Sequence, residues 1–166
     1  MYYVEELTEF YKHGIEYVIV GGLAVNLYGV PRATQDIDII ISLSKKNLDK
    51  FVAVMKKLGY QPTVNEDPLK LNDKKILRDW ISIRNMKAFS FFNKKSSYKV
   101  IDVVIFSPLI YERLSKKKKT IKIDSIEIYL AHIDDLIKIK SNSGREQDLS
   151  DIRMLKKIKK SGGVDD

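Results

Sequence analysis

The chain contains no cysteine and only two histidines, His13 and His132, which lie far apart in the sequence. Disulfide bonds and thiolate metal sites are therefore excluded, and a histidine-based zinc site is disfavoured. No apolar run approaches the roughly 18 residues that a membrane-spanning helix needs, and the N-terminus lacks the basic-then-apolar pattern of a secretory signal. These absences predict a cytoplasmic protein with no membrane partner, in which any metal site is built from carboxylates.

Basic side chains outnumber acidic ones, and the excess is concentrated in two lysine-rich segments. Lys and Arg total 30 against 22 Asp and Glu, which gives a formal charge of +8. Residues 116–119 are four consecutive lysines, and residues 156–160 contain four more. Nucleic acid is a plausible polyanionic partner, but charge alone favours the plainer interpretation of solvated lysine faces.

Three aspartates lie in two short runs of β-branched residues, and such runs are typical of strands. Asp36 and Asp38 belong to the run at residues 36–41, and Asp102 to the run at residues 100–106. Successive side chains of a strand point to opposite faces, so Asp36 and Asp38 share one face and isoleucines fill the other. Crowded carboxylates repel one another unless a cation neutralises them, and oxygen ligands suit Mg²⁺. The pattern predicts a metal site built from Asp36, Asp38 and Asp102.

A pair of glycines, Gly21 and Gly22, stands between a predicted strand at residues 15–20 and a predicted helix at residues 23–28. Free backbone N–H groups at such a junction favour phosphate, and the missing side chains let phosphate approach closely. The junction is therefore a candidate phosphate-binding turn.

Arg32 and Thr34 have the same strand parity as the two neighbouring aspartates if their strand begins early. Arg32 could then contact the same phosphate. Taken alone, Asp36 could simply start a strand, and Asp102 could face solvent from a sheet edge. Their occurrence together with the paired glycines favours a functional site.

Apolar periodicity and turn residues predict the other elements. A polar loop is expected over residues 61–73, and residues 74–83 are compatible with a short helix or an irregular segment. Helices are predicted over residues 4–13, 45–58, 108–114, 133–140 and 146–158, and antiparallel pairs join 86–92 with 98–106 and 120–123 with 126–129.

These motifs together resemble a known superfamily. Gly21-Gly22-Leu23-Ala24, then Arg32-Ala33-Thr34-Gln35-Asp36-Ile37-Asp38, then Asp102 in a later strand resemble the nucleotidyltransferases related to DNA polymerase β. The sequence is most similar to a small prokaryotic branch that includes abortive-infection toxin and minimal nucleotidyltransferases. Residues 135–140 and 144–152 resemble the C-terminal signature of that branch, so the resemblance covers about residues 15–155.

The resemblance implies an α/β nucleotidyltransferase fold, a mixed β-sheet flanked by helices with a helical C-terminal part. We expect a single domain over residues 1–160 and a flexible tail over residues 161–166. Within the domain, residues 1–107 would form the catalytic core and residues 108–160 a helical extension that includes a hairpin.

The resemblance also implies the chemistry, which is transfer of a nucleoside monophosphate from an NTP to a hydroxyl with release of pyrophosphate. Two Mg²⁺ ions, or Mn²⁺ in their place, would be held by Asp36 and Asp38, with Asp102 as the third carboxylate. Gly21 and Gly22 would hold the triphosphate. In one departure from the wider superfamily, which has Gly-Ser here, Gly22 is followed by Leu23 and Ala24, so this motif offers phosphate only backbone N–H groups.

Two readings are open for the charged residues of the C-terminal signature. Lys140 and Arg145 contact the triphosphate or the acceptor in the first, as the resemblance suggests. In the second they form salt bridges between helices with Asp148 and Asp151, which lie one turn apart.

The acceptor hydroxyl is not specified by the sequence. The basic excess and the likeness to toxin nucleotidyltransferases favour RNA, in particular a tRNA end, bound through residues 116–119. A protein hydroxyl or a small molecule such as an aminoglycoside remains open. The alternative hypothesis is a non-catalytic nucleotide- or RNA-binding protein that keeps the fold and acts with a partner protein in a toxin–antitoxin pair.

Overall fold

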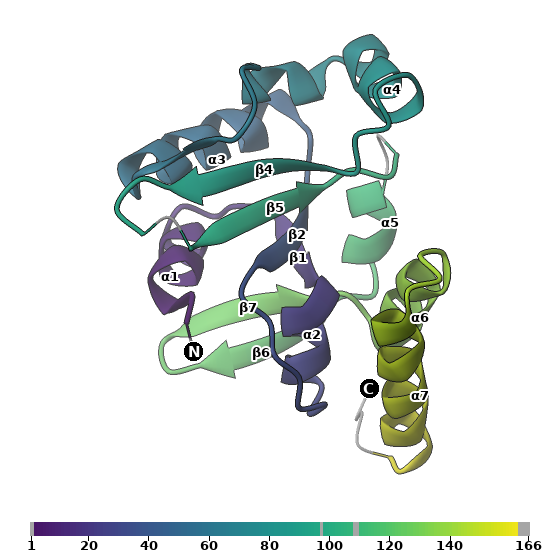
Figure 1. The fold of residues 1–166 in the computed structure, drawn as a ribbon. Coiled ribbons are helices and arrows are strands. Elements are labelled where there is room, and N and C mark those ends of the chain that lie inside the picture. The colour runs from purple at the N-terminus through teal and green to yellow at the C-terminus, as the bar shows by residue number, and fades with distance from the viewer. Residues whose placement is uncertain (1, 97, 108–109, 163–166) are drawn as a thin grey trace.

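The computed structural model describes residues 2–96, 98–107 and 110–162. Within these ranges, seven strands form one mixed sheet in the order β3-β4-β5-β2-β1-β7-β6 (Figure 1). The strands are β1 Tyr17–Val20, β2 Ile37–Ile41, β3 Tyr60–Pro62, β4 Ala88–Asn93, β5 Val100–Val104, β6 Lys119–Ile123 and β7 Ile126–Leu130. The helices are α1 Val4–Lys12, α2 Gly21–Leu27, α3 Lys45–Lys57, the 3₁₀ helix η1 Pro68–Asn72, α4 Lys74–Ser82, α5 Ile110–Ser115, α6 Ile133–Ser141 and α7 Glu146–Lys160.

The strand pairing places the two aspartate-bearing strands side by side at the centre of the sheet. β2 pairs with β1 in antiparallel fashion and with β5 in parallel, so Asp38 lies directly opposite Asp102. β4 continues the sheet antiparallel to β5, and Ser90 lies opposite Asp102 on that side. The register puts Asp38, Asp102 and Ser90 on one face of the sheet.

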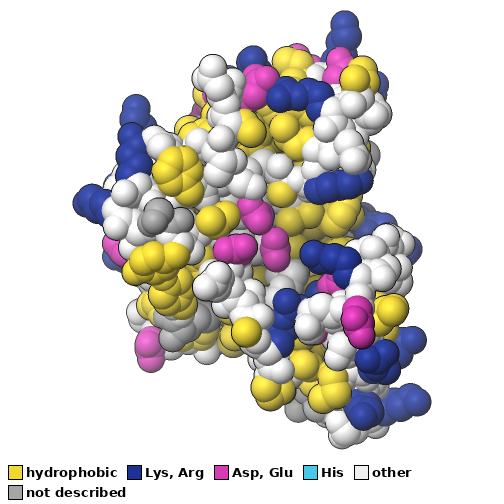
Figure 2. All heavy atoms as spheres, viewed as in Figure 1, with side chains coloured by type: hydrophobic (Ala, Val, Ile, Leu, Met, Phe, Trp, Pro, Cys, Tyr) yellow, Lys and Arg dark blue, Asp and Glu magenta, His cyan; other side chains and the backbone are white. Residues whose placement is uncertain are grey.

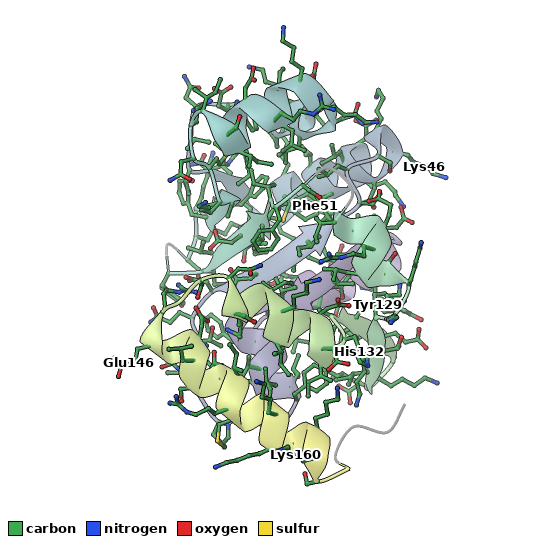
Figure 3. The ribbon with its side chains drawn as sticks, turned by 90° about the vertical axis from the view of Figure 1, so that its right-hand side faces the viewer. Lys46, Phe51, Tyr129, His132, Glu146 and Lys160 are labelled. Atoms are coloured by element: carbon green, nitrogen blue, oxygen red, sulfur yellow. The ribbon has the colours of Figure 1, made fainter. Side chains whose placement is uncertain are left out.

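The opposite face of the sheet is apolar and is covered by α1 and α3. Phe10 of α1 packs against Tyr17 with ring centroids 5.4 Å apart, and Phe51 of α3 packs against Phe91 at 5.7 Å. Phe51 points into the interior in Figure 3, whereas Lys46 on the same helix points outward. Burial of this face supplies the hydrophobic free energy that holds the aspartate strands in register. The strand residues of this face that are almost fully buried include Ile37, Ile39, Ile41, Ile101, Val103 and Phe89.

The C-terminal part contributes both to the sheet and to a helix pair. The predicted hairpin is confirmed as β6 and β7, and β7 joins the sheet in parallel with β1 through Ile19 and Leu130. His132 caps α6, because its Nδ1 accepts a hydrogen bond from the Asp134 N–H at 3.3 Å. α6 and α7 pack against each other beside α2 (Figure 1). The helical extension therefore lies next to the glycine turn.

Several boundaries differ from the sequence expectations. The strand that carries Asp38 begins at Ile37, so Arg32 and Thr34 lie on an irregular segment and not on a strand. The stretch expected to be a loop contains part of β3 and the 3₁₀ helix η1, which starts where the Asp67 side chain accepts from the Leu69 N–H. The stretch that had two readings is a helix, α4, capped by Asp73.

Two predictions fall on residues outside the described ranges. Pro108, the expected start of a helix, lies outside them, and α5 is described from Ile110. Most of the expected tail, residues 163–166, also lies outside them. Among the described residues, no helix is long and apolar enough to cross a membrane.

Candidate active site

At the glycine turn, β1 passes directly into α2, whose first two residues are Gly21 and Gly22, and the missing side chains allow others to approach the backbone. Gly21 has φ +64°, and a Cβ built on it would lie 1.9 Å from Asp38 Oδ2. A Cβ on Gly22 would lie 2.7 Å from Thr34 Oγ1 and 3.2 Å from the guanidinium carbon of Arg32. Side chains at these positions would therefore displace Asp38 and Thr34.

Three carboxylates line the hollow beside this turn. Asp38 and Asp102 are neighbours across the parallel pairing of β2 and β5. Asp36 is exposed and lies directly before β2, not on the strand as the sequence pattern predicted, because the regular pairing begins only at Ile37. Burial raises the pKa of Asp38 to about 6, and repulsion from Asp102 and Asp36 acts in the same direction. Burial also raises the pKa of Asp36, with a further contribution from Asp102. The cluster is therefore electrostatically unfavourable without a cation.

One oxygen of the cluster has no protein partner. Asp102 Oδ1 is buried and makes no hydrogen bond within the described part of the chain. Such buried oxygens are rare because an unpaired polar atom costs about 1–3 kcal/mol of folding free energy. A ligand that supplies a positive charge or a proton donor would remove this cost.

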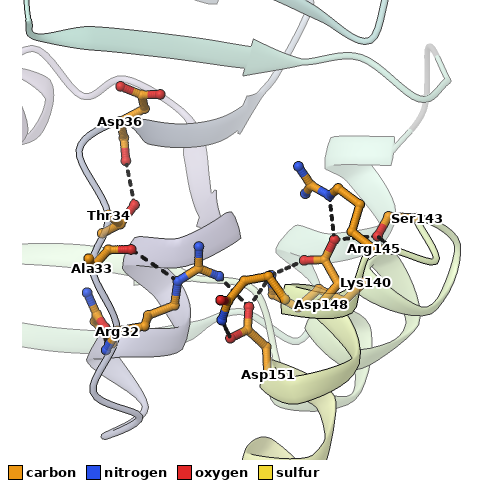
Figure 4. Close-up of polar contacts among 11 residues, drawn as sticks. Arg32, Ala33, Thr34, Asp36, Lys140, Ser143, Arg145, Asp148 and Asp151 are labelled. Carbon is orange, nitrogen blue, oxygen red and sulfur yellow. Dashed lines mark hydrogen bonds and ion pairs between the residues drawn. The ribbon is translucent and has the colours of Figure 1, made fainter.

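Basic side chains reach the site from the C-terminal helices (Figure 4). Lys140 Nζ, at the end of α6, lies 2.8 Å from both Asp148 Oδ1 and Asp151 Oδ2 of α7. Arg145 Nε lies 2.7 Å from Asp148 Oδ2, and Arg32 forms an ion pair with Asp151. The salt-bridge network, one of the two interpretations of the C-terminal charged residues, is therefore present.

The network surrounds two buried aspartates with basic side chains. Asp148 and Asp151 are 2% and 1% exposed. Burial by itself raises the pKa of Asp148, but hydrogen bonds from Lys140, Ser143 and Arg145 outweigh it and lower the pKa to about 2. The two anions therefore fix the directions of three cations and leave the group with a net positive charge.

All nine residues that the sequence indicated line one hollow of about 570 Å³, which we call the main hollow. The structure thus places Lys140 and Arg145 in the salt-bridge network and beside the aspartates at once. Ala33 and Gln35 complete the lining, and sequence reasoning had not singled them out. The lining is formed by Gly21, Gly22, Arg32, Ala33, Thr34, Gln35, Asp36, Asp38, Asp102, Lys140 and Arg145.

Comparison with known proteins connects this geometry to a family. The family described as "Nucleotidyltransferase of unknown function (DUF6036)" matches residues 3–160. The chain belongs to this family. No curated protein matches the sequence.

Two solved structures share the fold of this nucleotidyltransferase. The lincosamide antibiotic adenylyltransferase LnuA, solved with lincomycin bound, is 18% identical, with a TM-score of 0.62 over 95% of this chain and 96% of LnuA. An antigenic nucleotidyltransferase-like protein from Paracoccidioides brasiliensis is 16% identical, with a TM-score of 0.53 over 91% of this chain and 72% of that protein. The predicted superfamily and the α/β fold class are confirmed.

A buried tyrosine of this nucleotidyltransferase supports the segment that carries Arg32 and Thr34. The Tyr3 hydroxyl donates to the Gln35 carbonyl oxygen at 2.6 Å and accepts from the Val100 N–H at 3.2 Å. Tyr3 thereby connects the segment before β2 to the start of β5. A tyrosine ahead of an amphipathic helix gives no sequence signal for this role.

Proposed function

We propose that this protein transfers a nucleoside monophosphate from an NTP to an acceptor hydroxyl and releases pyrophosphate. The observation that carries the proposal is the position of Asp38 opposite Asp102, beside Asp36 and across the main hollow from Lys140 and Arg145. An acidic cluster next to a cationic group suits a metal-bound triphosphate, because one part binds cations and the other binds phosphate oxygens.

The acidic cluster fits divalent cations. Asp36, Asp38 and Asp102 would hold Mg²⁺ or Mn²⁺, which would neutralise phosphate charge and polarise the reacting oxygens when bound. Within the described residues, no three His, Cys, Asp or Glu side chains are close enough to hold a metal ion by themselves. Mg²⁺ in nucleotide sites commonly takes one or two carboxylates and completes its shell with water and substrate phosphates. The raised pKa of Asp38 and the unpaired Asp102 oxygen support the same assignment.

Basic residues of the main hollow would bind the phosphates, and one carboxylate would accept the proton. We assign Lys140, Arg145 and Arg32 to the phosphates of the leaving pyrophosphate. The acceptor oxygen bonds to the α-phosphorus, the bond to pyrophosphate breaks, and the hydroxyl proton passes to a carboxylate, for which we assign Asp102.

Thr34 supplies the hydroxyl that the glycine motif lacks. Its Oγ1 occupies the space into which a side chain at position 22 would project, 2.7 Å from the Cβ that Gly22 does not have. Among the residues that the structure describes, it makes a single hydrogen bond, a long one of 3.3 Å to the Asp36 carbonyl oxygen (Figure 4). We infer that this hydroxyl turns to a phosphate oxygen when the nucleotide binds.

We propose an RNA end as the acceptor, on the basis of the net charge of +8. A cytoplasmic role in a toxin–antitoxin pair belongs to the same proposal. LnuA, whose name describes an adenylyltransferase of a lincosamide antibiotic, covers nearly the same length, which supports a small-molecule acceptor as the second candidate.

The test offers every acceptor class at once. Each α-labelled NTP is incubated with Mg²⁺ and with total RNA, protein extract or lincomycin, using the wild type and Asp36→Asn/Asp38→Asn. Asp49→Asn is the matched control, because Asp49 is exposed on α3 and pairs with Lys45 away from the main hollow. Label transferred by the wild type and the control alone supports the enzyme and identifies its acceptor. Absence of transfer to any pool, together with tight RNA or partner binding, would replace it with the non-catalytic alternative.

A further inference from the structure

A second hollow of about 270 Å³ opens beside the main hollow and contains two exposed aromatic rings. It is lined by Tyr2, Thr34, Gln35 and Tyr98, and we call it the side hollow. Thr34 and Gln35 line both hollows, so the two share a wall. A molecule seated in the side hollow therefore lies next to the segment that leads into Asp36.

The rings are exposed, yet Tyr2 is supported from within. Tyr2 is 52% and Tyr98 is 63% exposed, and their ring centroids are 6.1 Å apart with planes inclined by 34°. Tyr3 packs edge-on against Tyr2 at 5.3 Å, and Lys99 Nζ lies 5.1 Å from the Tyr2 ring centroid. Lys99 is itself fixed at 2.9 Å from the buried Glu6 carboxylate. Large aromatic surfaces held in place but open to solvent are typical of binding surfaces.

The side hollow lies on the side of the aspartates from which an acceptor has to approach. Figure 2 shows acidic side chains at the centre of this face, with basic side chains to their right and a group of hydrophobic ones to their left. In Figure 1 the N-terminal end of α1 and the ends of β4 and β5 where these strands are connected lie on the left, opposite α6 and α7 on the right. Tyr2 comes just before α1 in the chain, and Tyr98 lies between β4 and β5. Attacking and leaving oxygens of phosphoryl transfer are roughly in line. If pyrophosphate leaves towards Lys140 and Arg145, the hydroxyl enters from the tyrosine side.

The charge around the side hollow favours a polyanion. The turn between β4 and β5 places exposed Lys94 and Lys95 close in sequence to Tyr98. Aromatic rings that stack bases, combined with lysines that follow the backbone, are the usual means of binding single-stranded nucleic acid. The sequence had pointed instead to residues 116–119, which line neither hollow.

We propose that Tyr2 and Tyr98 stack the terminal base of a single-stranded RNA whose 3′ hydroxyl is the acceptor, with its preceding phosphates along Lys94 and Lys95. The inference rests on the proposed function for the identity of the reaction, but not for the binding itself. The terminal base is recognised by stacking on the tyrosine rings, and every base has a face that can stack. The surface therefore accepts more than one base.

Binding is tested first, without NTP or metal. Fluorescence anisotropy follows a single-stranded RNA hexamer labelled at its 5′ end. Tyr2→Ala and Tyr98→Ala should each weaken binding by about 5- to 150-fold, whereas Phe at the same positions keeps the ring and most of the affinity. Tyr11→Ala is the matched control, because Tyr11 is a 41% exposed tyrosine that lines neither hollow. The Lys94→Ala/Lys95→Ala variant should reduce the salt slope by about 1.4. Hexamer binding that neither alanine variant changes would overturn the proposal.

Steady-state kinetics then shows whether the side hollow binds the RNA acceptor or the NTP. Loss of the rings should raise KM for RNA and leave KM for NTP unchanged; the reverse would make the side hollow a nucleotide-base pocket and refute the proposal. Transfer to lincomycin with no affinity for the hexamer would refute it as well. Ring-dependent hexamer binding without transfer to any acceptor would keep the stacking surface and remove the proposed function.

Discussion

Replacing Gly21 by alanine tests whether the close approach of Asp38 to the glycine turn is required. Both the backbone and the contact oppose the new side chain. At φ +64° an L-residue costs about 1–2 kcal/mol. The added Cβ would also lie 1.9 Å from Asp38 Oδ2 and under 3 Å from Asp38 Cγ and Cβ, and overpacking of this kind typically costs about 1–3 kcal/mol. Asp38 cannot retreat easily, because it is paired with Val20 and Asp102 in the sheet.

The expected result is a loss of about 2–5 kcal/mol in the free energy of unfolding and at least a roughly 100-fold loss of NMP transfer, since a displacement of about 1 Å in a reacting group costs that much. Urea denaturation measures the first and label transfer the second. Gly14→Ala is the control, because Gly14 has φ +57° but its Cβ would meet only Lys50 Nζ, at 3.7 Å. It should show the backbone cost and keep full activity. A Gly21→Ala protein as active as the control would refute the reasoning.

Four further outcomes are expected. Because the pKa of Asp148 is lowered to about 2 from 3.8, its contribution to stability is present above pH 4 and lost as pH falls through 2. In urea denaturation, the free energy of unfolding of the wild type should decline by roughly 2 kcal/mol over this range, and Asp148→Asn should lack this decline. Lys140→Met removes the buried cation that Asp148 and Asp151 share, which leaves each carboxylate with only its arginine, and it should cost about 3–5 kcal/mol in the same assay, so a neutral effect would contradict the network. Thr34→Ala should raise KM for NTP about tenfold. Gly22→Ser should lower KM again only when it is combined with Thr34→Ala, because the Thr34 hydroxyl, which lies 2.7 Å from the position of the new Cβ, is then gone. Mg²⁺ and NTP together should raise Tm more than either alone, and an Asp38→Asn protein that keeps this effect would argue against the metal assignment.

Much of the site follows from local sequence rules. The isoleucines at positions 37, 39 and 41 had to be buried, and strand alternation then placed Asp38 on the other face; the structure has this arrangement. The turn at Gly21 and Gly22 likewise follows from the change between a short apolar run and a helical pattern.

Features that depend on contacts between distant parts of the chain could not be predicted from local sequence patterns. Nothing in the local pattern of residues 120–129 says that their hairpin joins the main sheet beside β1, because that depends on which edge remains unpaired after β1, β2 and β5 have assembled. The side hollow could not be predicted from the sequence either, since Tyr2, just before α1, and Tyr98, between β4 and β5, come together only in the folded chain. Arg32 reached the main hollow from an irregular segment, where the parity rule does not apply.

The ion pair between Arg32 and Asp151 has a consequence for the order in which the two sides of the main hollow form during folding. Its two residues are separated by 119 positions, and bringing such distant segments together costs loop entropy that local contacts do not repay. During synthesis, the aspartates and the glycine turn emerge from the ribosome long before α7 does. The cationic side of the main hollow is therefore assembled last, and an unfinished chain is expected to be unable to hold a triphosphate.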